Sequence, residues 1–321
     1  MTTNCRHLFH FLFPRQTDEW LGVLRVGLGL ELAFYCLSAR PGWIAVFSSS
    51  RGALSPRRIS EALISLESSL VPRVNWFLQI GGRIGIPEST TLWMIWTVLF
   101  ATSLLLIIGL FCRPAAITGW FLHLACIKSS EVFAYGMDLF LNIGLFYLMW
   151  APLPDLRAVE NRIWKSGASD SRMVGFFRRV LQLHLCAIYF FSGLAKCLGN
   201  GWWNGMNVWE AVTRPPFNVF DPGFVARWRA VLAPAGIAIC LIELGYPLFI
   251  WPRKTRAIWL GCVVGMHVAI GIVMGMYLFA FVMIVLNVAA FAPKLIVVRR
   301  HRALSHTPSD LRLDERARQP G

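Results

Sequence analysis

The stretch YFFSGLAKCLGNGWWNG, residues 189–205, decides the fold class, because an apolar run of aromatic and small residues ends there in a lysine. Lys196 stands where a membrane-spanning helix passes from hydrocarbon to headgroups, and glycines and two tryptophans follow at once. Tryptophan is enriched at the membrane interface, and a lysine at that level can extend its charge toward water. The pattern indicates a transmembrane helix that continues into a tight interfacial turn.

The composition supports the same fold class. The chain of 321 residues is 56% hydrophobic and 15% charged, with 14 Trp and 23 Phe, which is too apolar for a soluble domain of this length. Its net charge of +14 does not indicate a nucleic-acid partner, because the arginines lie between apolar segments and in the tail rather than in one basic motif. We predict an all-α, polytopic transmembrane helix bundle that contacts membrane lipids and binds no nucleic acid.

About eight segments resemble spanning helices, although two of them are short. A span needs about 20 mostly apolar residues. The predicted helices are 20–38, 91–111, 114–129, 138–152, 175–198, 231–252, 255–274 and 277–293.

The connecting segments carry further signals. Proline and basic residues in FCRP (111–114) and PRKTR (252–256) predict tight hairpins between neighbouring helices. Within the long segment 39–90, apolar residues recur at helical spacing, which predicts one amphipathic helix on the membrane surface. These residues are Ile59, Leu63, Leu66 and Leu70.

We expect the chain to divide into an interfacial N-terminus at 1–19, a transmembrane domain at 20–293 and a basic, disordered cytoplasmic tail at 294–321. With eight crossings both termini share one side, and more Lys and Arg lie on that side. The positive-inside rule therefore predicts a multi-pass protein of the cell membrane with both termini in the cytoplasm. Lys196 and the turn 129–138 then lie at the outer face. The eight cysteines form no CxxC pair and are predicted to be packing residues rather than metal ligands or disulfides.

A polar stripe marks the fifth predicted span. Steps of three and four residues join Gln182, Cys186, Tyr189, Gly193 and Lys196 on one helix face. Such a stripe is expected to face protein, and two interpretations of the lysine stay open. It borders a cavity, where partial dehydration would let the amine act as a general base, or it is an interfacial anchor.

Other polar residues of the predicted spans are candidates for the same site. Asp138 and Asn142 share a face of the fourth span, and Glu131 lies in the preceding turn. Asp138 is expected either to approach Lys196 and orient it or to act as a charge at a helix N-terminus. His184 is twelve residues from Lys196, about 18 Å along the helix, so it is expected to be a packed histidine.

Three more ionisable residues lie inside predicted spans. Arg25, Glu31 and Glu243 are each either functional or paired between helices, because charge in a membrane needs a partner or water. His123 and His267 are isolated, without an HxxxH or HExxH pattern, so no metal site is predicted.

These segments together resemble the horizontally transferred transmembrane family, the membrane module of vitamin K-dependent gamma-carboxylase and many bacterial proteins. The resemblance spans residues 18–295 and is carried by three segments. They are WLGVLRVGLGLELAFYCL (20–37) with the following loop SSSRGALSPRR, LQLHLCAIYFFSGLAKCLGNGWWNGMNVWEAV (181–212) and ELGYPLFIWPRKTRAIWLGCVVGMHVAIGIVMGMYLF (243–279).

The resemblance implies a chemistry for Lys196. In the carboxylase, a lysine of the matching segment is held to deprotonate vitamin K hydroquinone, so a quinol is the implied cofactor here. We therefore expect a bacterial inner-membrane enzyme in which Lys196, Asp138 and Glu131 are catalytic at the outer leaflet. The residues expected to contact the substrate are Gln182, Tyr189, Gly193, Asn142, Trp202, Glu243 and His267.

Two other functions stay open. Similar stand-alone modules include membrane proteins that mature a sporulation-delay peptide toxin, so a small secreted peptide is a candidate partner. In that case Lys196 would contact a lipid headgroup or a partner without catalysis. A third class is a proton-coupled transporter that uses Glu31, Glu243 and His267.

Overall fold

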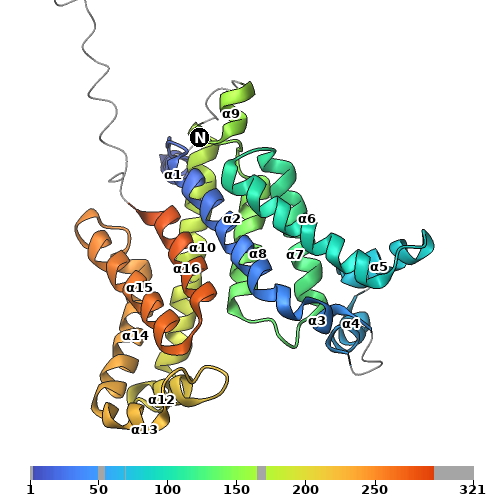
Figure 1. Ribbon diagram of the computed structural model, residues 1–321. Coiled ribbons are helices and arrows are strands. Elements are labelled where there is room, and N and C mark those ends of the chain that lie inside the picture. The colour runs from blue at the N-terminus through green and yellow to red at the C-terminus, as the bar shows by residue number, and fades with distance from the viewer. Residues whose placement is uncertain (1–2, 50–54, 69, 165–170, 293–321) are drawn as a thin grey trace, which may run out of the picture. The chain divides into compact units, whose positions relative to one another are not determined.

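The computed structural model describes residues 3–49, 55–68, 70–164 and 171–292, and every regular element within them is a helix (Figure 1). In this part of the chain, five helices are long and apolar enough to cross a membrane. They are the segment Glu19–Phe47, which contains α2 (Glu19–Ala39), and α6 (Glu88–Ile108), α10 (Ser171–Cys197), α14 (Arg229–Phe249) and α15 (Arg253–Met274). The all-α class is confirmed, and the helices are compatible with a multi-pass membrane protein. The predicted tail at 294–321 lies outside the described residues.

All eight apolar segments singled out in the sequence form helices. Besides the five above, these are α7 (Cys112–Ser129), α8 (Gly136–Trp150) and α16 (Tyr277–Phe291). At 15 residues each, α8 and α16 are shorter than a full span. Eight crossings therefore stay a prediction.

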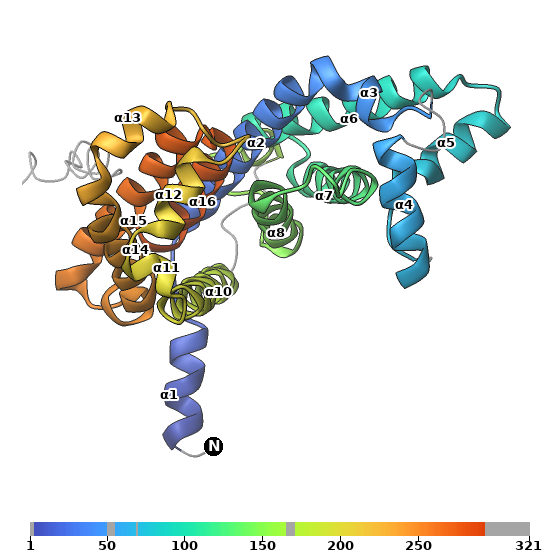
Figure 2. The same ribbon diagram turned by 90° about the horizontal axis from the view of Figure 1, so that it is seen from below.

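The remaining described elements are short. They are α1 (Thr3–Leu12), η1 (Arg40–Gly42), α3 (Trp43–Phe47), α4 (Pro56–Glu67), α5 (Val74–Arg83), α9 (Val159–Trp164), α11 (Asn200–Trp203), α12 (Met206–Thr213) and α13 (Pro222–Arg227). Figure 2 shows α1 extending away from the bundle beside α10.

Tight turns join successive long helices where the sequence places glycine and proline. Gly109 ends α6 with a left-handed φ of 82°, a conformation that glycine adopts without a Cβ clash. Pro252 precedes the first turn of α15 and cannot continue α14. Both predicted hairpins therefore form.

Polar contacts tie loops together at one end of the bundle. The Glu160 backbone N–H donates to the Gly109 carbonyl at 2.8 Å, and Gln16 N–H donates to the Ser171 carbonyl at 3.0 Å. The first bond joins α9 to the α6–α7 turn, and the second joins the residues before α2 to the start of α10, both toward the top of Figure 1. Long helices that are consecutive in the chain run in alternate directions (Figure 1).

Arg25 is a buried charged residue at this end of the bundle. Its Nε donates to Asp155 Oδ2 at 2.6 Å, and its Nη1 donates to the carbonyls of Leu106 and Ile107. The side chains of Arg25 and Asp155 are 2% and 1% exposed. Arg25 therefore has a structural role, because it fixes the α8–α9 connection against α2 and α6.

Helix α2 occupies the centre of the bundle between α6, α8 and α16. Small residues let its neighbours approach, as is common between membrane helices. A Cβ on Gly27 would lie 2.5 Å from Val285 of α16, and one on Gly144 of α8 would lie 2.8 Å from Leu28.

The segment 39–90 contains α3, α4 and α5, so the prediction of a single helix there is wrong. Helix α4 carries Ile59, Leu63 and Leu66 of the predicted apolar face, ends before Leu70, and turns this face outward. Leu63 and Leu66 are 57% and 84% exposed. Its buried face is polar: Arg57 pairs with Glu61 at 3.1 Å, and Glu61 accepts a hydrogen bond from Ser129 of α7 at 2.6 Å. An outward apolar face is the arrangement expected of a helix in contact with lipid.

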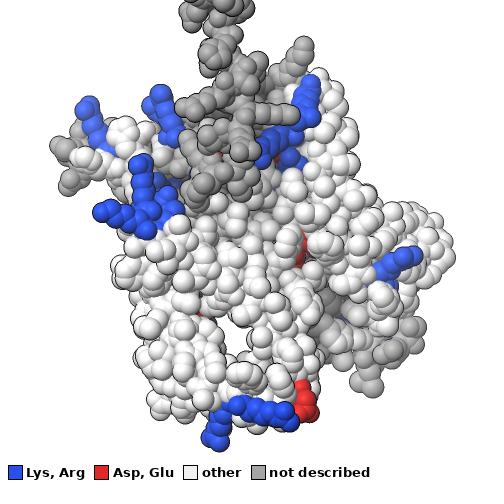
Figure 3. Space-filling model, turned by 60° about the vertical axis from the view of Figure 1, so that its left-hand side comes forward, with Lys and Arg blue, Asp and Glu red and all other residues white. Residues whose placement is uncertain are grey.

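The distribution of charged side chains on the surface also agrees with a membrane protein. On the face drawn in Figure 3, Lys and Arg gather mainly toward the upper and lower ends, with a mostly uncharged band between them. Exposed large apolar side chains are common, among them Phe191 at 66% and Leu248 at 70%. Such a surface suits hydrocarbon rather than water.

Candidate functional site

The candidate site is centred on Lys196, near the C-terminal end of α10. Its Nζ donates to Glu243 Oε2 of α14 at 2.7 Å and to Ser192 Oγ at 2.6 Å. The two charged side chains are 20% and 9% exposed, so the pair is partly covered but open on one side. Lys196 is therefore held as an ammonium against a carboxylate at the edge of the bundle.

Gly193 explains why these two helices meet at this level. A Cβ at this position would lie 2.5 Å from the Leu244 backbone nitrogen and 3.0 Å from the Glu243 Cβ. The absent side chain lets α14 approach α10 closely, one turn before Lys196. Gly193, a member of the polar stripe, therefore brings Glu243 within reach of Lys196.

The turn after α10 covers the lysine with an aromatic ring. Lys196 Nζ lies 5.4 Å from the centroid of the Trp202 ring, within range of a cation–π interaction. Gly205, with a φ of 81°, packs against α14, where a Cβ would lie 2.5 Å from the Ala233 nitrogen. Gly205 thus holds the tryptophan turn against the helix that carries Glu243.

A second polar layer lies two turns deeper and joins α10, α14, α15 and α16. The Tyr189 hydroxyl lies 2.8 Å from His267 Nε2 and accepts from Asn287 Nδ2 at 2.8 Å. The Tyr246 hydroxyl donates to Asn287 Oδ1 at 2.7 Å. These four side chains form one buried, hydrogen-bonded network.

Sequence reasoning includes Tyr189 and His267 in the site but misses Tyr246 and Asn287. A signal for Asn287 is present in the sequence: it is the one amide in the apolar run 277–291. Tyr246 lies in an apolar segment beside Pro247, and nothing in its spacing indicates a polar partner.

The acidic partners expected for Lys196 are elsewhere, which corrects the prediction. Asp138 caps α8 by accepting from the Tyr135 backbone nitrogen at 3.0 Å, so its helix-terminus interpretation describes it better. Glu131 pairs with Lys128 at 3.3 Å on the exposed turn. Asn142 donates to the Trp120 carbonyl at 3.2 Å.

The remaining stripe residues are buried as expected. Gln182, 8% exposed, donates to the Ala290 carbonyl at 2.7 Å and accepts from Arg179 at 3.0 Å. Its position on α10 is fourteen residues before Lys196, about 21 Å along the axis. Gln182 therefore joins α10 to α16 and does not reach the lysine.

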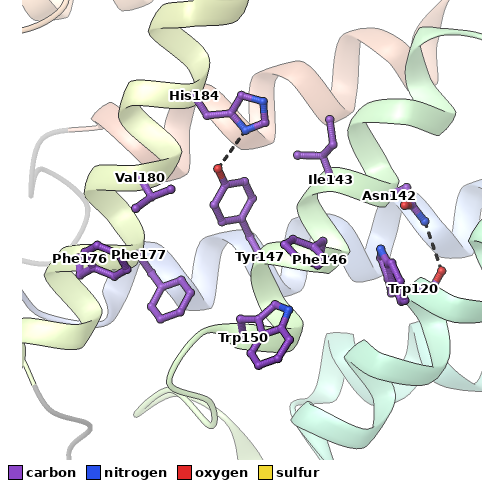
Figure 4. Close-up of a pocket in the computed structure, with 10 residues that line it drawn as sticks. All are labelled: Trp120, Asn142, Ile143, Phe146, Tyr147, Trp150, Phe176, Phe177, Val180 and His184. Carbon is purple, nitrogen blue, oxygen red and sulfur yellow. Dashed lines mark hydrogen bonds between the residues drawn. The ribbon is translucent and has the colours of Figure 1, made fainter.

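A cavity of about 590 Å³ lies between α7, α8 and α10, away from the lysine (Figure 4). The His184 Nδ1 and the Tyr147 hydroxyl lie 2.9 Å apart at its wall, so His184 lines a cavity rather than packing in the core. Its lining residues are Trp120, Asn142, Ile143, Phe146, Tyr147, Trp150, Phe176, Phe177, Val180 and His184. Lys196 is not among them, so this cavity is not the one expected beneath the lysine.

Among the described residues, no group of three His, Cys, Asp or Glu side chains is arranged to hold a metal ion. The Lys196 site itself presents an ammonium, a carboxylate and an aromatic ring. An ammonium can stabilise a negative oxygen, and a carboxylate beside it can accept a proton. No family model, no curated protein and no solved structure matches the chain.

Proposed function

We propose that this protein is a bacterial inner-membrane protein of eight spans that transfers a proton from a weakly acidic, membrane-dissolved amphiphile at the outer leaflet. The observation that carries the proposal is the 2.7 Å contact between Lys196 Nζ and Glu243 Oε2 at a partly open edge of the bundle. A quinol is the substrate class that the family resemblance implies, with vitamin K hydroquinone as its model.

The pair changes the proposed role of the lysine. Because Lys196 is bound to a carboxylate, Glu243 is the group that accepts the proton, and the ammonium of Lys196 stabilises the oxyanion that forms. In this step the substrate O–H bond breaks, its proton passes to Glu243, and its electron pair stays on the oxygen beside Lys196. The attraction between Lys196 and Glu243 is replaced by that between Lys196 and the oxyanion, so charge is conserved.

The surface around Lys196 suits an amphiphile. Phe191 of α10 and Leu198, directly after the helix ends, are 66% and 79% exposed, so the side of this segment that faces away from Lys196 is apolar at the same level. The ring of Trp202 stands beside the ammonium, where it can contact an aromatic head group.

An alkylated nitrophenol in nanodiscs tests the proposal, because its phenolate absorbs visible light. The wild type is expected to bind the dye and raise the phenolate signal near neutral pH. Lys196→Ala should abolish this signal, whereas Glu243→Gln, which leaves the ammonium without its counter-ion, should keep the signal while the proton of the dye passes to the buffer. A signal that survives both substitutions contradicts the proposal, and Lys128→Ala, in the exposed pair with Glu131, is the matched control.

A second function is favoured by the Trp202–Lys196 contact, which also suits the capture of an anionic lipid headgroup without chemistry. The two functions differ at Lys196→Arg and Glu243→Gln. For headgroup capture, both variants should still co-purify the same lipids by mass spectrometry, and the phenol should show no change of protonation in the wild type. Co-purified quinones that disappear in Lys196→Ala would instead support the quinol.

A further inference from the structure

A separate cluster of ionisable side chains lies between α2, α7 and α8. Glu31 of α2 and His123 of α7 are both 0% exposed. Among the described residues, neither carboxyl oxygen of Glu31 and neither ring nitrogen of His123 has a hydrogen-bond partner. Buried polar atoms are nearly always hydrogen-bonded, so four unpartnered atoms in one region require a physical explanation.

Asp138 and Tyr35 connect the two residues. His123 Nε2 lies 3.8 Å from Asp138 Oδ1, beyond hydrogen-bond distance. Tyr35, one turn after Glu31 on α2, sets its ring edge-on to the His123 ring at a centroid distance of 4.9 Å. The Asp138 carboxyl is also near enough to Glu31 to repel a negative charge there. The three helices therefore bring two carboxyls and one imidazole to a common buried space.

An ionised Glu31 is incompatible with these surroundings. A buried carboxylate without a cation or a hydrogen bond costs several kcal/mol. Among the described residues, no Lys or Arg pairs with Glu31, and Asp138 would add repulsion. Glu31 avoids both penalties when it carries a proton.

We propose that Glu31, His123 and Asp138 form a proton-binding site inside the bundle, with Glu31 as the group that holds the proton. His123 and Asp138 are the acceptors toward which that proton can move. Asp138 stands in the first turn of α8, beside the exposed turn that contains Val132 and Phe133, so it is the member closest to the bundle end. This site shares no residue with the Lys196–Glu243 pair and does not depend on the proposed function.

The other titratable groups near the site are tyrosines and cysteines, which carry no positive charge. None of them can therefore act as a cation for Glu31. The two further helices packed on α2, α6 and α16, carry titratable groups only at their first residues, Glu88 and Tyr277. The nearer groups, contributed by α2, α7 and the start of α8, are Tyr35, Cys36, Cys126 and Tyr135.

Labelling with dicyclohexylcarbodiimide tests this proposal, because the reagent attacks only protonated carboxyls and enters membranes. The carbodiimide nitrogen takes the acid proton and the carboxyl oxygen adds to its central carbon. In the full chain in nanodiscs at neutral pH, peptide mass spectrometry should find Glu31 modified and Glu243 unmodified. Sodium should not protect Glu31, and protection by sodium would overturn the proposal in favour of a metal-cation site. Glu131→Gln, which removes an exposed carboxyl, is the matched control and should leave the labelling of Glu31 unchanged.

A second measurement covers the case in which the reagent cannot reach a buried side chain. A protonated Glu31 must release its proton when the protein unfolds at neutral pH, by linkage between folding and protonation. In weakly buffered detergent with a pH indicator, the wild type should therefore release one proton more on unfolding than Glu31→Gln does. Equal release by the two proteins shows that Glu31 is ionised in the folded state and overturns the proposal.

Discussion

Two buried carboxyls, Glu243 and Glu31, lie in the same helix bundle and differ in what surrounds them. Glu243 meets an ammonium at 2.7 Å, whereas neither oxygen of Glu31 has a partner among the described residues. A carboxyl in an apolar medium is stable either as half of an ion pair or as a neutral acid. The comparison therefore assigns the charged state to the Lys196 site and the protonated state to the α2–α7–α8 cluster.

The helix contact that creates the pair is the most sensitive point. We expect Gly193→Val to destabilise the protein by about 3 kcal/mol, because the new side chain has to displace the α14 backbone. The ion pair should separate at the same time, so phenolate formation should be lost as well. Thermal unfolding in detergent measures the first effect, and Gly261→Ala, at a position with open space around it, should change little. Unchanged stability would show that α10 and α14 do not touch at Gly193.

The second largest effect is expected in the buried hydrogen-bonded network that lies below the Lys196–Glu243 pair. Asn287→Ala should cost about 2 kcal/mol, because two buried phenols, Tyr189 and Tyr246, each lose a partner. Asn142→Ala removes one partly buried bond to Trp120 and is expected to have a smaller effect. If the two variants melt alike, the network does not contribute to stability beyond a single bond.

The ion pair itself should give a measurable coupling. We expect a double-mutant cycle of Lys196→Met and Glu243→Gln to yield about 1 kcal/mol, since the pair is partly covered and only partly screened. The exposed Lys128–Glu131 pair is the control and should couple less. Equal coupling in the two cycles would mean that burial adds nothing at Lys196.

The smallest change in stability is expected at Glu31, whose carboxyl has no hydrogen-bond partner among the described residues. Glu31→Gln replaces a neutral acid by a neutral amide of the same shape, so stability should change by no more than about 0.5 kcal/mol. A melting curve at neutral pH measures this change. A loss as large as that of Glu243→Gln would indicate that Glu31 is ionised and has a charged partner.

How much of the site the sequence predicts depends on the range of each interaction. The spacing of Gln182, Tyr189 and Gly193 predicts their burial, because one helix face is set by local periodicity. The partner of Lys196 is 47 residues away on another helix, and one helix's periodicity carries no information about which neighbour it meets.

The fold shows the same limit. The apolar segments predict every long helix, because hydrophobic length is a local property. The bundle positions of α8 and α16, and hence the grouping of Glu31 with His123, depend on packing between helices far apart in sequence. The sequence predicts that Asp138 lies at a helix N-terminus, because it stands in the first turn of an apolar segment. The sequence does not predict how far Asp138 lies from Lys196, because the two residues are on different helices.

Infrared difference spectroscopy of the two carboxyls tests the central comparison most directly. A protonated carboxyl has a C=O stretch well above the carboxylate bands, and the band shifts in D2O. At neutral pH, the account predicts that this band is present in the wild type, is lost in Glu31→Gln and persists in Glu243→Gln. Loss of the band in Glu243→Gln and its persistence in Glu31→Gln would contradict the account.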